Sequence, residues 1–178
     1  MGALDGILVA DFSRVLAGPQ AAMTLGDFGA NVVKVESPAG DETRDWKPPV
    51  DDRGRATYFL TVNRNKHSVA LDLKDPEDLK LAAELARRAD VLIENFRPGT
   101  MERFGLDFEA VRKDNPGIVY CSITGFGRGE GAALPGYDPL VQALSGLMSV
   151  TGPPAGEASK GGVALVDVIA GLNASNGI

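Results

Sequence analysis

The chain has 178 residues, with 18 Lys and Arg against 24 Asp and Glu, so its formal net charge is −6, and 44% of its residues are apolar. These values are typical of a globular domain with its own core, and they exclude disorder along the whole length. The negative balance argues against a nucleic-acid partner bound through a broad basic face, and no apolar run reaches the ~18 residues of a membrane span.

Short apolar runs alternate with helical segments along the chain. Strands are predicted at residues 7–12, 32–36, 58–62, 68–73, 91–93, 117–123 and 163–166. Helices are predicted at residues 20–25, 76–88, 98–104, 107–113 and 139–148, and a last helix begins near Asp167. Long loops fill residues 37–56 and 125–136. This alternation predicts an α/β domain with a Rossmann-like, mostly parallel sheet, flanking helices and a ligand site at the strand C-terminal ends.

Cysteine and histidine are nearly absent. The single Cys121 excludes a disulfide framework, and one cysteine with one histidine excludes a zinc site made of these residues, so no metal is expected. The N-terminus has no basic segment followed by an apolar stretch, so no secretion signal is predicted. We therefore expect a cytoplasmic protein.

The common nucleotide and hydrolase motifs do not fit. The glycine-rich run at residues 125–131 lacks the dinucleotide pattern because Glu130 stands where a glycine is needed, and no P-loop motif occurs. A Ser-His-Asp triad would have to use His67, which lies in a charged turn, and no nucleophile-elbow motif occurs. Carboxylates are therefore the candidates for covalent chemistry.

Two segments are candidate sites. Asp167 follows the predicted strand 163–166 and precedes a helix, where the helix dipole would keep it ionised and able to attack an acyl carbon. The alternative is that Asp167 only caps the helix. Phe96 and Arg97 follow the predicted strand 91–93, where an aromatic ring could stack on a base and a guanidinium could bind a phosphate. A loop with one packed aromatic is the other interpretation, and both pairs of alternatives stay open.

A series of segments resembles a known family. They are residues 11–19, 29–36, 63–68, 71–74, 89–99, 122–127, 136–138 and 166–167. In order and spacing they resemble the class III CoA-transferases, the family of carnitine CoA-transferase, formyl-CoA transferase and bile-acid-inducible protein F. The resemblance implies that residues 1–178 are the N-terminal part of the family's large, CoA-binding α/β domain. The smaller second domain and the C-terminal return segment are absent, so we expect a truncated chain.

The resemblance also implies an activity and its residues. CoA moves from an acyl-CoA donor to a small carboxylic acid, through a mixed anhydride and a CoA thioester on the catalytic aspartate, which matches Asp167. Tyr137 and Asp138 match positions that line the reaction centre. Residues expected to contact CoA are Val15, Leu16, Ala17, Leu71, Asp72, Leu73, Lys74, Asn95, Phe96, Arg97 and Arg103. The full-length form is expected to be a homodimer of interlocked chains.

Two other functions are considered. The related α-methylacyl-CoA racemases carry a histidine where this chain has Tyr137, so one of the two bases for proton exchange is missing here. Leu16 stands where formyl-CoA transferases carry glutamine, which argues against formyl or oxalate specificity. The other function considered, besides the racemase, is that of a catalytically incomplete fragment that binds CoA.

Overall fold

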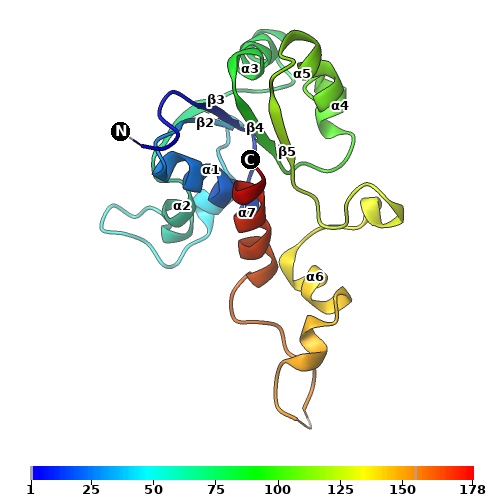
Figure 1. Cartoon of the computed structure of the whole chain (residues 1–178). Helices are drawn as coiled ribbons and strands as arrows, with labels where there is room; N and C mark the ends of the chain where they lie inside the picture. The colour runs from blue at the N-terminus through cyan, green and yellow to red at the C-terminus, as the bar shows by residue number, and fades with distance from the viewer. Residues whose placement is uncertain (1, 155) are drawn as a thin grey trace.

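The computed structural model describes residues 2–154 and 156–178. Five parallel strands form one sheet in the order β3-β2-β1-β4-β5 (Figure 1). The strands are β1 (Leu8–Asp11), β2 (Asn31–Glu36), β3 (Lys66–Ala70), β4 (Val91–Glu94) and β5 (Val119–Ser122). The predicted α/β class with a Rossmann-like parallel sheet is confirmed.

Helices cover both faces of the sheet. They are α1 (Ala17–Asp27), α2 (Thr57–Val62), α3 (Pro76–Arg88), α4 (Thr100–Phe104), α5 (Phe108–Asp114), α6 (Asp138–Leu144) and α7 (Leu165–Gly177), with 3₁₀ turns η1 (Glu42–Asp45), η2 (Glu130–Ala133) and η3 (Leu147–Val150). The segment with α6 and η3 extends away from the sheet (Figure 1). No helix within the described ranges is long and apolar enough to cross a bilayer.

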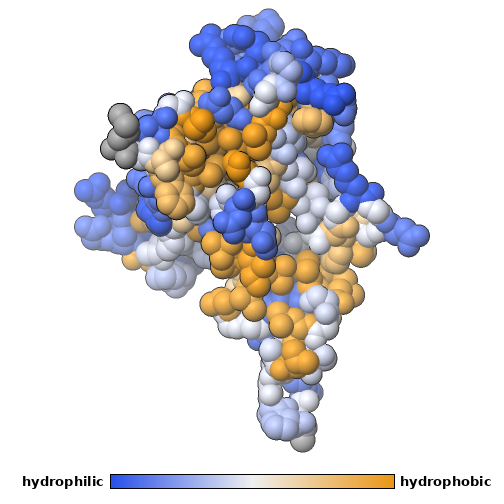
Figure 2. Space-filling view, viewed as in Figure 1, coloured by the Kyte–Doolittle hydropathy of each residue, from blue (hydrophilic) through white to orange (hydrophobic). Residues whose placement is uncertain are grey.

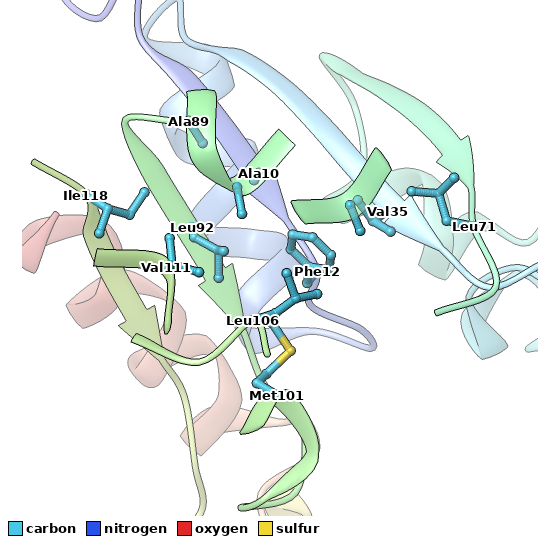
Figure 3. Packing of buried hydrophobic residues seen from close by; sticks show 12 residues of the cluster. Ala10, Phe12, Val35, Leu71, Ala89, Leu92, Met101, Leu106, Val111 and Ile118 are labelled. Atoms are coloured by element: carbon cyan, nitrogen blue, oxygen red, sulfur yellow. The ribbon is translucent and has the colours of Figure 1, made fainter. Parts of the chain in front are cut away.

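Alternating side chains of the inner strands build two cores. In β4, Leu92 faces the core below α3–α5, whereas Val91 and Ile93 face the core below α1 and α7, so the strand is buried on both sides. Figure 3 shows the first core, where Phe12 and Leu106 meet beside Leu92. Hydrophilic residues gather over the α3–α5 end of the molecule, and hydrophobic ones gather along α7 and the sheet beside it (Figure 2).

Local signals explain the best-predicted helix. The Asp75 carboxylate accepts hydrogen bonds from the N–H groups of Glu77 (2.9 Å) and Asp78 (3.2 Å), and Pro76 occupies the first helical position of α3. Arg87 and Arg88 fall in the last turn, where they interact favourably with the helix dipole.

Two predicted strands are wrong. Residues 58–62 form α2, which packs outside the sheet, because the pairing of β2 selects the next segment, with Lys66 opposite Val32. A short apolar run does not by itself distinguish a strand from a helix. Residues 163–164 form a bend, in which the Val163 carbonyl accepts from the Leu165 N–H, and residues 165–166 are the first two residues of α7.

Candidate active site

The site is organised where the strand order reverses. The chain leaves β1 toward β2, whereas β4 continues to β5 on the other side, so the carboxyl ends of β1 and β4 lie side by side at the point where open α/β sheets bind ligands. Asn95 joins the two loops there: its Oδ1 accepts from the Arg14 N–H (2.8 Å) and its Nδ2 donates to the Arg14 carbonyl (2.7 Å). The Arg14 guanidinium lies 5.1 Å from the centre of the Phe96 ring. The Phe96 ring also packs, partly buried, against the core below α3–α5, so this edge carries a packed aromatic ring with a cation beside it.

Helix α7 brings Asp167 to the same edge. Its start packs against the loop before α1, because Ala164 and Val168 lie in one cluster with Val15 and Leu16. Its middle lies against the first residue of α1, because a methyl group at Gly171 would be 2.7 Å from the Ala17 carbonyl oxygen. Its end reaches the core below α1, where Ala174 and Ile178 are packed. The two helices therefore run in the same direction, and Asp167, in the first turn of α7, lies at the end where the loop after β1 enters α1. Glycine at position 171 permits this close contact between backbones.

The environment of Asp167 disfavours its charge. Burial, and secondly the neighbouring carboxylate of Asp138, raise the pKa of the Asp167 carboxyl to about 6. Within the described part of the chain, no donor forms a hydrogen bond to this carboxylate. A partly buried carboxylate with a raised pKa and no described donor is a candidate nucleophile or base.

Asp138 makes the contacts that Asp167 lacks. Its Oδ1 accepts from the N–H groups of Val166 (2.8 Å) and Asp167 (3.4 Å), and its Oδ2 accepts from Nε2 of Gln142 (2.5 Å). The interpretation of Asp167 as a helix cap is therefore wrong, because Ala164 occupies the N-cap position and Asp138 supplies the capping oxygen from α6. Tyr137, directly before it, is 63% exposed.

The raised pKa of Asp167 predicts that this side chain destabilises the protein at neutral pH. The folded-state pKa of Asp167 is about 6 against an ordinary 3.8, so the folded chain binds a proton at this residue more tightly than the unfolded chain does. The loss of folding stability caused by ionising Asp167 therefore grows as pH rises from 4 to 6. We expect Asp167→Asn to raise the free energy of unfolding by about 1–2 kcal/mol at pH 7.5, less than the full pKa difference because the group is partly exposed.

Urea unfolding at pH 7.5 and pH 4 measures this effect. The gain should largely disappear at pH 4, where the folded chain is protonated at this position and the unfolded chain is about half protonated. Asp52→Asn is the control, because Asp52 is exposed and its substitution should change stability by less than about 0.5 kcal/mol. A gain of equal size at both pH values would show that packing, not charge, causes it.

An aromatic pair beside Asp167 was not found from the sequence. The rings of Trp46 and Tyr58 lie 5.0 Å apart, and Tyr58 packs in the cluster that contains Ala164 and Val168 of the α7 start. Burial, and next the charges of Asp167 and Asp138, raise the pKa of Tyr58. Nothing in the sequence indicates that Trp46 and Tyr58 pair, because Trp46 lies in the irregular segment 37–56 and Tyr58 lies in residues 58–62, which were predicted to be a strand.

One buried ion pair holds residues 37–56 against the sheet, and a second joins β1 to β3. Lys34 in β2 pairs with Asp41 (3.0 Å) and donates to the Ser13 carbonyl (2.8 Å), and its side chain is 1% exposed. Lys66 in β3 pairs with Asp11 at the end of β1 (2.8 Å). The sequence signal was a lysine inside the apolar run of residues 32–35, where a charge is rare unless it is paired.

The residues predicted to contact CoA occupy several places at the carboxyl edge of the sheet. Leu16 packs with Val15 and Val168 near the start of α7, and Val15 has a φ of 67° at the turn into α1. The segment 71–74 follows β3, with Asp72 and Lys74 on its more exposed side. Arg97, after β4, and Arg103, on α4, are not buried. The structure thus brings residues 15–17 against the α7 segment that carries Asp167 and joins Asn95 to Arg14, and it leaves the outer cations accessible to solvent.

Comparison with known proteins identifies the chain's relatives. A family model described as CoA-transferase family III matches residues 4–178. Succinyl-CoA:glutarate CoA-transferase of Mus musculus is 48% identical over 180 residues, which cover 100% of this chain and 41% of that protein. Acetyl-CoA:oxalate CoA-transferase of Acetobacter aceti is 46% identical over 174 residues, which cover 96% of this chain and 44% of that protein.

Solved structures match equally well. A CAIB/BAIF family protein from Brucella suis superposes with a TM-score of 0.95 at 45% identity, covering 99% of this chain and 48% of that one. A protein from Mycobacterium tuberculosis superposes with a TM-score of 0.91 at 39% identity, covering 99% of this chain and 49% of that one. The chain spans less than half the length of each of these relatives.

Proposed function

This chain belongs to CoA-transferase family III, and from that premise we propose that it serves to transfer CoA from an acyl-CoA to a carboxylic acid, with Asp167 as covalent nucleophile. The observation that supports this role is the carboxylate of Asp167 itself. It is partly buried, lies at the carboxyl edge of the sheet beside residues 15–17, and receives no hydrogen bond from the described residues. Nothing in its described surroundings assigns it a structural task.

The proposed reaction uses four acyl transfers without redox chemistry. An Oδ atom of Asp167 attacks the donor carbonyl and the carbon–sulfur bond breaks, which gives a mixed anhydride and CoA thiolate. The thiolate attacks the aspartyl carbonyl and releases the donor carboxylate, leaving an aspartyl thioester. The acceptor carboxylate attacks that thioester and frees the thiolate again, which then takes the acyl group and regenerates Asp167.

The partly buried surroundings of Asp167 suit this sequence. Partial burial limits the access of water to the anhydride and the thioester, and partial desolvation makes the carboxylate more reactive. The rings of Trp46 and Tyr58 supply apolar surface on the α2 side. A pKa of about 6 keeps the carboxylate ionised at neutral pH, and we infer that its protonation slows transfer as pH falls below 6.

The proposed CoA contacts follow the edge of the sheet. Phe96 offers a ring for the adenine, and the accessible cations Arg97, Arg103 and Lys74 offer charge to the phosphates. Residues 15–17 and 71–73 would line the path between these groups and Asp167. The amide of Asn95 would act indirectly, because both of its polar atoms bond to the Arg14 backbone.

The assembly is also a proposal. The relatives are more than twice as long as this chain, and we infer that residues 1–178 form the N-terminal part of a CoA-binding domain within an interlocked homodimer in the cytoplasm. The donors and acceptors in the relatives' names provide the first substrates to test: succinyl-CoA and acetyl-CoA as donors, and glutarate and oxalate as acceptors.

Trapping of the intermediate tests the proposal. After incubation with succinyl-CoA and then hydroxylamine, we expect Asp167 to carry a hydroxamate, because hydroxylamine displaces CoA thiolate from an aspartyl thioester. Peptide mass spectrometry locates the label. Asp138 and Asp52 serve as internal controls and should stay unmodified. Turnover with an unmodified Asp167 would reject the covalent mechanism, and exchange of the substrate α-proton with solvent deuterium, without an acceptor, would indicate a racemase instead.

A further inference from the structure

Helix α7 begins without a capping side chain of its own. Its N-cap residue is Ala164, which offers no side-chain acceptor. The N–H groups of Val166 and Asp167, at the second and third helical positions, bond instead to Oδ1 of Asp138. An N-cap side chain normally serves these two amides. The helix that carries the proposed nucleophile is therefore capped from α6.

Gln142 holds that cap in place. It lies one turn after Asp138 on α6 and is 0% exposed. Its Nε2 donates to Oδ2 of Asp138 (2.5 Å) and lies 3.4 Å from the Val163 carbonyl oxygen, and its Oε1 accepts from the Gly161 N–H (2.7 Å). One buried amide thus joins α6 to the segment that leads into α7. Removing it would leave buried polar partners unsatisfied.

We propose that Gln142 is a positioning residue for Asp167: it orients Asp138, and through Asp138 it holds the first turn of α7 and the nucleophilic carboxylate. The proposal rests on the proposed function of Asp167. Gln142 is fully buried, and its hydrogen bonds are to Asp138, Gly161 and Val163. Its loss should therefore lower kcat and leave the KM for acyl-CoA nearly unchanged. A misplacement near 1 Å costs about 10²-fold in rate.

Two titratable groups interact with Asp167. The charge of Asp138 on α6 raises the pKa of Asp167, and the charge of Asp167 in turn raises the pKa of Tyr58 on α2. The α1 side contributes the apolar Leu16 and Ala17. A change at Gln142 therefore reaches Asp167 through Asp138 and the helix start.

Two variants and one control test the proposal. Gln142→Met keeps the volume and removes both hydrogen-bonding ends, and Gln142→Glu keeps the shape but replaces the donor to Asp138 with an acceptor. The control is Asn115→Ala, which removes another amide bonded to backbone carbonyls, those of Ala86 and Ala89, on the other face of the sheet. Amide hydrogen exchange by NMR and the kinetics of CoA transfer are measured for each.

The expected result has a structural and a kinetic part. In both Gln142 variants the Val166 and Asp167 amides exchange about fivefold faster, as expected for a weakened helix cap. kcat falls about 10²-fold with little change in KM, and the control shows neither effect. Unchanged exchange at both amides, or faster exchange with an unaltered kcat, would overturn the proposal. Failure of the unaltered protein to transfer CoA would instead reject the function of Asp167, while the exchange data still decide whether Gln142 anchors the helix.

Discussion

Replacing Asp167 with Ala is expected to reduce CoA transfer by at least about 10³-fold, because no covalent intermediate can form without the carboxylate. Acyl-CoA binding should change little, since the proposed CoA contacts are made by other residues. The chain should remain folded, because Asp167 lies in an already capped turn and its carboxylate bonds to no described donor. Initial rates of CoA transfer, together with calorimetric binding of CoA, measure the two effects separately.

Two further substitutions refine this test. Asp167→Asn keeps the shape without a nucleophilic oxygen and should be as inactive as the alanine variant. Asp167→Glu keeps the nucleophile but displaces it by one methylene, and we expect a loss of about 10²-fold. Asp52→Asn, at an exposed position, should transfer CoA at the unaltered rate. Substantial transfer by the asparagine variant would be incompatible with covalent catalysis at this residue.

Replacing Lys34 with Met is expected to lower the free energy of unfolding by about 3–5 kcal/mol, because it leaves a buried carboxylate without its counter-charge. The side chains of Lys34 and Asp41 are 1% and 0% exposed, and no described hydrogen bond reaches Oδ2 of Asp41. Lys34 also donates to the Ser13 carbonyl, so one substitution removes two buried contacts. Urea or thermal unfolding measures the loss.

An exposed pair provides the matched control. Lys80 and Glu77 lie 2.6 Å apart on α3, but their side chains are 71% and 78% exposed. Lys80→Met makes the same chemical change there and should cost less than about 1 kcal/mol. Equal losses at both positions would show that burial does not decide the strength of these pairs. A loss confined to Lys34 would also explain how the segment with Trp46 and Tyr58 stays against the sheet.

Local chemistry was sufficient to predict several elements. The start of α3 follows from Asp75 and Pro76, and the start of α5 follows from Asp107, whose carboxylate accepts from the N–H groups of Glu109 and Ala110. Strand β4 follows from its apolar run. These elements depend on residues a few positions apart, so their signals are complete within a short window of sequence.

Asp167 shows where such reasoning stops. Its role as a nucleophile could be predicted from the sequence, but its setting could not, because residues 163–166 are as apolar as a strand and no capping residue precedes the helix. The cap comes from Asp138, which lies 28 and 29 positions before the two amides that it binds. Gln142 and Tyr58 were missed for the same reason: their roles depend on contacts between distant segments.

By itself, the sequence determined the α/β class and the family, because alternating apolar runs and the order of motifs are properties of the linear chain. It also predicted a carboxylate as the reactive group, because the residues for other common nucleophile or cofactor motifs are missing. Only the tertiary structure decided the strand order, the ion pairs of Lys34 and Lys66, and the surroundings of Asp167. Those features arise when segments far apart in sequence are buried together, and burial determines which charges must be paired and which carboxylate stays without a hydrogen bond.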